Sequence, residues 1–193
     1  MSQSAARKKL GSSDDIFLVV AMLDVEVAMM RACAEVCAQS WTSRSDSRAF
    51  KLALIGDEKT AGVSTENILV PGRVSDEELN VWLCAADCAW LPLRSSPLNE
   101  GRLPHKIGHY RSYGLPLITN SSSVDIEMIR DPGVIRVAFD DAAIIEQTLA
   151  TKRMTDAERS AEIKRGQDVF AWDGILKEFI ERVKSQLAKP NAT

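Results

Sequence analysis

Short apolar runs alternate with amphipathic stretches along most of the chain. Residues 16–22 (IFLVVAM) are uninterrupted apolar residues, which is typical of a strand buried on both faces of a sheet. Shorter runs that are mostly apolar predict strands at 51–55, 67–70, 87–91, 115–119 and 134–139. Helical periodicity and capping residues predict helices over 25–39, 75–86, 105–113, 125–130, 140–150, 156–170 and 173–187. This alternation predicts an α/β fold, a single Rossmann-like parallel sheet with helices on both faces.

The length of 193 residues suits one domain with short appendages. Residues 1–14 are polar and rich in serine, so we expect a flexible, linker-like segment there. The domain itself is predicted to occupy residues 15–187, with a tail at 188–193.

Composition and charge exclude several classes of function. The chain is 45% hydrophobic and 26% charged with a net charge of −3, which argues against broad binding to nucleic acid or a membrane surface. No apolar run approaches the length of a membrane span, and the basic N-terminus lacks the apolar core of a secretory signal. We therefore expect a cytoplasmic location.

Two pairs of cysteines and one pair of histidines have the spacing of metal ligands. The cysteine pairs fall in predicted core positions, so reduced buried thiols are favoured over a zinc site. His105 and His109 would share one helical face, but the glutamate of a metalloprotease helix is missing between them. We predict no metal site and no cofactor.

The most informative stretch is a basic loop, broken by Gly and Pro, that leads into the helix predicted from His105. The amino end of a helix presents backbone N–H groups and a partial positive charge, which suit a phosphate. Arg102 and Lys106 lie four residues apart at this point and offer two cations to the same anion. A phosphate-bearing ligand is the first hypothesis, and a solvated basic turn is the alternative.

Ligands of open α/β sheets bind beyond the carboxyl ends of the strands. Four polar loops are predicted there, and they comprise residues 56–57, 72–74, 93–103 and 119–124. The last of these, with its run of serines, offers hydroxyl groups for a second anion contact. The glycine-rich motifs of dinucleotide-binding proteins and P-loop enzymes, and the G-x-S-x-G motif of hydrolases, do not occur.

Several short motifs, in this order, resemble the C-terminal, donor-binding domain of GT-B glycosyltransferases of group 1. They are KLALIG (51–56), NILVPGRVSDEEL (67–79), ADCAWLP (86–92), PHKIGHY (104–110), GLPLI (114–118) and FAWD (170–173). Residues 6–11 are similar to the interdomain segment just upstream of that domain. The resemblance covers nearly the whole chain and implies one half of a GT-B architecture, which holds a nucleotide-activated sugar.

By position, the resemblance implies a role for several residues. Gly72 and Val74 match the loop that contacts the base, and His109 takes the place of an acid that usually holds the ribose. The segment Glu100-Gly101-Arg102 matches the loop that approaches the donor sugar and diphosphate, and Lys106 belongs to a Pro-x-Lys variant of that loop. Glu100, Arg102 and Lys106 are then the candidates for acting at the reacting bond, where cations stabilise the departing diphosphate.

The sequence also departs from the family's pattern. The two glutamates that many members carry correspond to Gly101 and His109, with Glu100 one residue out of register. Asp24 and Glu26 stand where Arg and Lys commonly follow the first strand. A complete GT-B enzyme also has a preceding acceptor-binding domain, which this chain lacks the length to contain.

The leading interpretation is a glycosyltransferase donor-binding domain. It would bind a UDP or GDP sugar and act with an acceptor domain that is separate or missing, as in a split or truncated enzyme. One alternative is a non-catalytic nucleotide-binding or assembly module that partners another transferase subunit. Another is half of a sugar-nucleotide epimerase, which shares the architecture.

Overall fold

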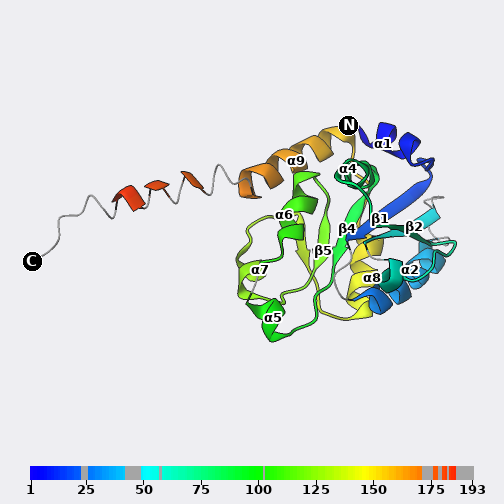
Figure 1. The fold of residues 1–193 in the computed structure, drawn as a ribbon, viewed down its shortest axis with the longest axis horizontal. Coiled ribbons are helices and arrows are strands. Elements are labelled where there is room, and N and C mark those ends of the chain that lie inside the picture. The colour runs from blue at the N-terminus through cyan, green and yellow to red at the C-terminus, as the bar shows by residue number, and fades with distance from the viewer. Residues whose placement is uncertain are drawn as a thin grey trace, which may run out of the picture.

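The computed structural model describes residues 1–22, 26–41, 49–56, 58–101, 103–170, 176–177, 180–181 and 183–185. These residues form a six-stranded parallel sheet with the order β3-β2-β1-β4-β5-β6 (Figure 1). The strands are β1 (Ile16–Met22), β2 (Ala49–Ile55), β3 (Ile68–Gly72), β4 (Cys88–Leu91), β5 (Leu117–Thr119) and β6 (Val134–Arg136). The predicted Rossmann-like parallel sheet is confirmed.

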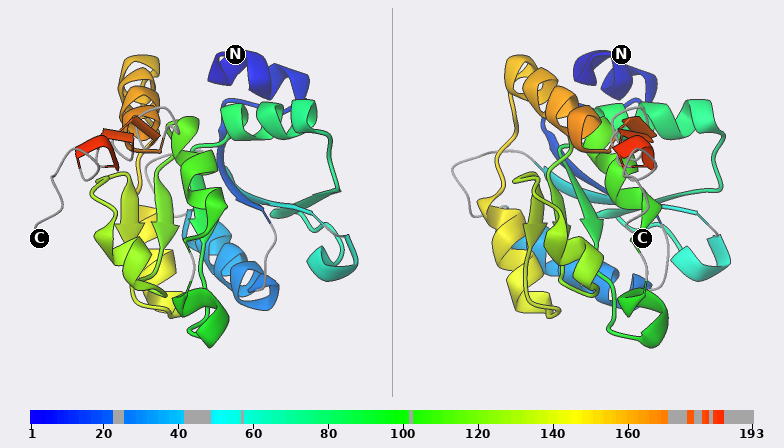
Figure 2. Two further views of the ribbon diagram at one scale, coloured as in Figure 1. Left: turned by 60° about the vertical axis from the view of Figure 1, so that its left-hand side comes forward. Right: turned by 90° about the vertical axis from the view of Figure 1, so that its left-hand side faces the viewer.

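Helices cover both faces of this sheet, as Figure 2 shows from two further sides. One face carries α2 (Val27–Trp41), α3 (Glu58–Ala61) and α8 (Asp141–Ala150). The other carries α1 (Gln3–Lys9), α4 (Asp76–Ala85), α6 (His105–Ser112), α7 (Val124–Met128) and α9 (Asp156–Phe170), and α9 packs against α6. The short helix α5 (Pro97–Glu100) lies in the loop between β4 and α6.

The core has two layers because successive side chains of each strand point to opposite faces. In β1, Phe17 and Val19 belong to the cluster under α2 and α8, whereas Leu18 and Val20 belong to the cluster under α4 and α6. All four residues are at most 1% exposed, so β1 is buried on both faces as its apolar run predicted.

Some element ends differ from the predicted ones. The third strand was expected to stop before Pro71, but β3 continues through Gly72, whose carbonyl accepts a hydrogen bond from the Gly56 N–H at 3.0 Å. A proline is tolerated there because β3 is an edge strand. The fifth and sixth strands are shorter than predicted, since β5 begins at Leu117 and β6 ends at Arg136.

The N-terminal segment differs from the expected linker. Residues Gln3–Lys9 form α1, which packs against α4. The side chain of Arg7 is 1% exposed, and its Nη2 lies 2.6 Å from Oδ2 of Asp87, whose carboxylate is fully buried. Local composition does not indicate an ion pair between residues this far apart in the sequence. The polar composition of the segment therefore predicted a linker.

The last predicted helix falls partly outside the described residues. Residues 176–177, 180–181 and 183–185 are helical, and Leu176, Ile180 and Val183 of the predicted apolar stripe are between 40% and 48% exposed. The FAWD motif lies outside the described residues except for Phe170, which packs against the cluster under α6.

Candidate functional site

The strand order creates one crevice at the carboxyl edge of the sheet. After β1 the chain passes to the face with α2, whereas after β4 it passes to the face with α6, although the two strands are neighbours. Such a switch point leaves room for a ligand beyond the two strand ends. These ends are Met22 and Leu91, and the loops predicted to hold a ligand follow strands that end at this same edge.

Lys106 lies at the centre of this edge. Its Nζ donates a hydrogen bond to the Met22 carbonyl at 3.2 Å, and the Met22 N–H donates to the hydroxyl of the fully buried Tyr110 at 2.6 Å. The first turn of α6 therefore lies against the end of β1. Because α6 runs antiparallel to the strands, its amino end, with the dipole's positive pole, faces the crevice. The structure thus places Lys106 where a phosphate site was predicted.

The loop before α6 is organised by its own contacts. The Glu100 carboxylate accepts a hydrogen bond from Ser95 Oγ at 2.7 Å, and both residues are exposed. Gly101 is exposed, and Arg102 lies outside the described residues. The predicted pairing of Arg102 with Lys106 on one anion therefore remains a prediction.

Gly72 and Val74 lie at the same sheet edge but further from Lys106, because β3 is separated from β1 by β2. Gly72 has a φ of +78°, which favours glycine at this turn. Val74 is half-buried and lines a hollow of about 400 Å³ together with Pro71 and Trp82. An apolar wall next to a glycine turn is compatible with the contact to a base that the resemblance implies.

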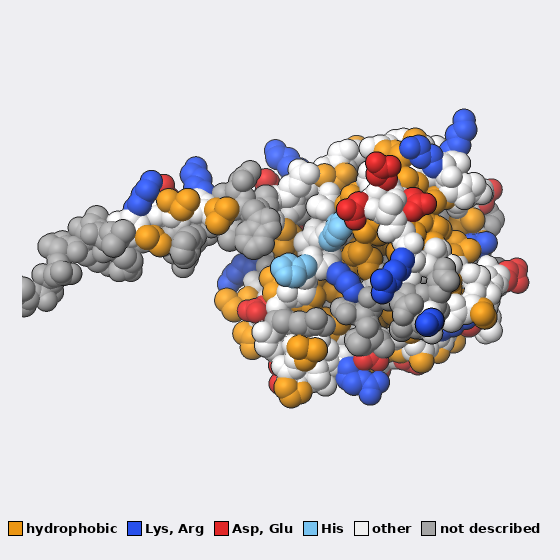
Figure 3. Space-filling view, in the orientation of Figure 1, with side chains coloured by type: hydrophobic (Ala, Val, Ile, Leu, Met, Phe, Trp, Pro, Cys, Tyr) orange, Lys and Arg blue, Asp and Glu red, His pale blue; other side chains and the backbone are white. Residues whose placement is uncertain are grey.

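His109 lies on a different hollow from Val74. It is exposed, its ring centroid is 5.9 Å from that of Tyr113, and it lines a pocket of about 440 Å³ with His105 and Phe170. Figure 3 shows both histidines on the face that also presents a group of basic side chains. The structure therefore does not bring His109 together with Val74, and the ribose role of His109 remains untested.

The loop after β5 was expected to offer hydroxyl groups to an anion. Instead, the Asn120 side chain binds both backbone groups of Leu93, at 2.8 Å each, and Ser123 Oγ accepts the N–H of Ile126 to cap α7. Ser122 Oγ is buried and has no hydrogen-bond partner within the part of the chain that the structure describes. Through Asn120, this loop holds the loop that follows β4, and its contact with an anion stays a prediction.

Sequence reasoning missed one contact across the crevice, an ion pair between Glu26 and Arg94. Arg94 Nε and Nη2 lie 3.2 Å from the two carboxylate oxygens of Glu26. The hydrogen bond and charge of Glu26 raise the pKa of the Arg94 guanidinium above its ordinary value. Because the partners are far apart in the sequence, no spacing rule could have indicated the pair.

The cysteines do not form a metal site together. All four are free and buried, and Cys84 and Cys88 belong to the clusters on opposite faces of the sheet. Within the described ranges, no group of three or more His, Cys, Asp or Glu side chains has the arrangement of a metal site. The described helices also include none with the length and apolar character needed to cross a membrane.

No family model matches the sequence, and no curated protein matches it either. Several solved structures share its fold. HepE from Anabaena, solved in complex with UDP and glucose, has a TM-score of 0.61 and 14% identity, over 95% of this chain and 52% of its own. A glycosyltransferase from Rickettsia africae has a TM-score of 0.62 and 12% identity, over 97% of this chain and 52% of its own.

A third match is WaaG, a glycosyltransferase of lipopolysaccharide biosynthesis, with a TM-score of 0.60 and 17% identity over 89% of this chain and 47% of its own. The chain thus spans about half the length of the glycosyltransferase structures it matches. At these identities the likeness concerns the fold. The chain has the fold of one half of a GT-B glycosyltransferase, as its motifs predicted.

Proposed function

We propose that this chain is the donor-binding half of a glycosyltransferase and binds a nucleotide-diphosphate sugar, such as a UDP or GDP sugar. The observation that carries the proposal is the position of Lys106, at the amino end of α6 and against the end of β1 at the switch point. A diphosphate there would meet a cation and the positive end of a helix together. The match to HepE, which was solved with UDP and glucose, supports the same class of ligand.

The proposed chemistry depends on the leaving group of glycosyl transfer, which is the nucleotide diphosphate. When the bond between the sugar's anomeric carbon and the diphosphate oxygen breaks, the electron pair goes to the diphosphate, which gains negative charge. Cations and backbone N–H groups at that point stabilise the developing charge. Lys106 is the candidate for this role within the described residues, and we propose that Arg102 joins it. Glu100 is proposed to approach the donor sugar, since it precedes the loop that leads to α6.

The acceptor would be held by a second domain or subunit, because the matched glycosyltransferases are about twice as long as this chain. Among the described residues, no contact specifically favours the non-catalytic module. Titration with a UDP sugar, together with an assay of glycosyl transfer, distinguishes the enzyme from the non-catalytic module. Binding of UDP sugar without transfer, even after addition of the acceptor-binding half, would support the non-catalytic module. Transfer restored by that half would support the enzyme.

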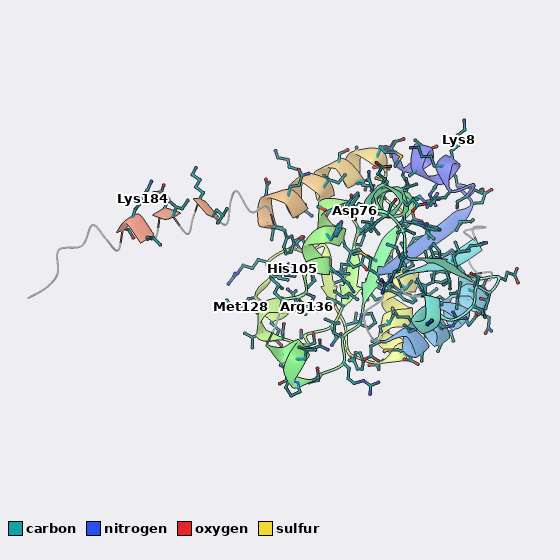
Figure 4. All side chains as sticks on the ribbon, in the orientation of Figure 1. Lys8, Asp76, His105, Met128, Arg136 and Lys184 are labelled. Carbon is teal, nitrogen blue, oxygen red and sulfur yellow. The ribbon has the colours of Figure 1, made fainter. Side chains whose placement is uncertain are left out.

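Isothermal titration of the full chain with UDP and with GDP tests the site. Lys106→Ala removes a charge-assisted contact and is expected to weaken binding by about 1.5–3 kcal/mol, which is roughly tenfold or more. Lys8→Ala is the matched control. Lys8 is an exposed lysine of α1, and Figure 4 shows it at the upper right edge of the domain, away from His105. Equal affinity of the wild type and Lys106→Ala would reject the site.

A further inference from the structure

The ion pair between Glu26 and Arg94 has an unusual distribution of exposure. The Glu26 side chain is 9% exposed, whereas the Arg94 side chain is 72% exposed. Glu26 uses both of its carboxylate oxygens on the Nε and Nη2 of Arg94. A guanidinium has additional N–H donors besides these, in a fixed plane. A buried carboxylate therefore holds one edge of the guanidinium, while most of the arginine side chain faces solvent.

The pair also lies at the switch point. Glu26 comes just before α2, shortly after Met22, whose carbonyl accepts the hydrogen bond from Lys106. Arg94 comes shortly after the end of β4, the strand next to β1. The ion pair therefore joins the segment that follows β1 to the segment that follows β4, at the two strand ends that border the crevice.

The backbone around Arg94 is held on both sides. The Arg94 carbonyl accepts a hydrogen bond from Asn99 Nδ2 at 2.7 Å. The preceding residue, Leu93, is bound through its N–H and its carbonyl by the side chain of Asn120. Both the backbone and the guanidinium of this exposed arginine are thus fixed before any ligand arrives, which lowers the entropic cost of binding.

We propose that Arg94 is a phosphate-binding residue of the nucleotide site and that Glu26 is the residue that positions it. This inference rests on the proposed function, since it assigns a second cation to the same anion site as Lys106. Arginine suits this task because its planar fork matches the oxygens of a phosphate, and a carboxylate on one edge leaves another edge for the ligand. It also explains how a chain with Asp24 and Glu26 after its first strand can present a cation there.

Titration of the full chain with UDP tests the assignment. Arg94→Ala is expected to raise the Kd about tenfold, and Arg94→Lys, which keeps the charge but loses the fork, about threefold. Arg130→Ala is the matched control, because Arg130 is an exposed arginine shortly before the start of β6, at the other edge of the sheet. Its Kd should equal that of the wild type.

The positioning role of Glu26 needs a measurement that a merely structural role would not change. With Arg94 present, Glu26→Gln is expected to raise the Kd about threefold, because the guanidinium loses its fixed orientation. In the Arg94→Ala background the same change removes an unpaired negative charge near the phosphate, so the Kd should stay equal or fall. The double variant also leaves no buried charge without a partner, so it tests the site even if Arg94→Ala alone folds poorly.

The outcomes separate the two proposals. If Lys106→Ala weakens UDP binding and Arg94→Ala leaves the Kd unchanged with a native unfolding temperature, the role of Arg94 is overturned and the proposed function stands. If Glu26→Gln raises the Kd equally in both backgrounds, its positioning role is overturned. If neither UDP nor GDP binds the wild-type chain, the proposed function itself fails.

Discussion

Removal of the Asp131 carboxylate should destabilise the fold strongly, because it takes away the charge that compensates a buried arginine, Arg111. Arg111, in the last turn of α6, is fully buried. Its Nε and Nη2 lie 2.7 and 3.1 Å from the oxygens of Asp131, whose side chain is also fully buried. The same guanidinium donates to the Leu115 carbonyl at 2.6 Å and to Glu162 at 2.5 Å.

The expected magnitude for Asp131→Ala is about 3 kcal/mol. Breaking a buried ion pair by removing one partner costs about 3–5 kcal/mol, because the remaining charge is left without compensation. The lower end applies here since Glu162, which is 19% exposed, stays in contact with Arg111. For a domain of this size, that loss lowers the midpoint of thermal unfolding by about 6–12 °C.

Urea unfolding followed by circular dichroism measures this loss directly. Asp168→Ala is the control, because Asp168 is an exposed residue of α9, and its replacement should change stability by at most about 0.5 kcal/mol. A loss below about 1 kcal/mol for Asp131→Ala would refute the reasoning. Replacing both partners, as in Arg111→Met with Asp131→Leu, should restore much of the stability, because no unpaired charge remains.

Three further predictions concern stability and reactivity. Gly133→Ala should cost about 3 kcal/mol in urea unfolding, because an added Cβ would lie 2.0 Å from Cζ of Arg111. The hydrogen bond from the Ser75 N–H lowers the pKa of the Glu78 carboxyl in the folded chain. The stability that this hydrogen bond adds is therefore present above the unfolded pKa of Glu78 and is lost as the pH falls. The difference in unfolding temperature between the wild type and Glu78→Gln should shrink between about pH 6 and about pH 3. Burial raises the pKa of the Cys33 and Cys37 thiols to about 12 and also raises that of the Cys88 thiol. At about pH 8 these three thiols should therefore react with a disulfide reagent only after the chain is unfolded in urea. Rapid reaction of the folded chain would contradict this.

Much of the fold could be predicted because its signals are local. The apolar run at 16–22 needs two covered faces, and β1 has them. The capping box of Ser75 and Glu78 forms as the sequence predicted, with both reciprocal hydrogen bonds. Interactions between distant residues left no such signal. The N-terminal segment is helical and buried because Arg7 meets Asp87, and only the folded chain brings these residues together.

The candidate site shows the same division. Lys106 could be placed at the sheet edge, because a basic residue in the first turn of a helix after a parallel strand must lie there. The partner of Glu100 could not be predicted, because Ser95 and Glu100 meet only through the turn of α5. In the sequence, Asp24 and Glu26 stand where the family's pattern commonly has Arg and Lys, which favoured the non-catalytic nucleotide-binding module slightly. In the structure, the negative charge of the Glu26 carboxylate is balanced by the guanidinium of Arg94.

The position of Lys106 depends on contacts at both ends of α6. Lys106, in the first turn, and Tyr110, one turn later, bind the two backbone groups of Met22, the last residue of β1. At its carboxyl end, Arg111 is held by Asp131 just before β6. Because α6 is bound both to the end of β1 and to the turn before β6, the Lys106 ammonium is oriented before a ligand binds. Loss of Asp131 should therefore weaken nucleotide binding as well as stability, whereas loss of Lys106 should weaken binding with little effect on unfolding.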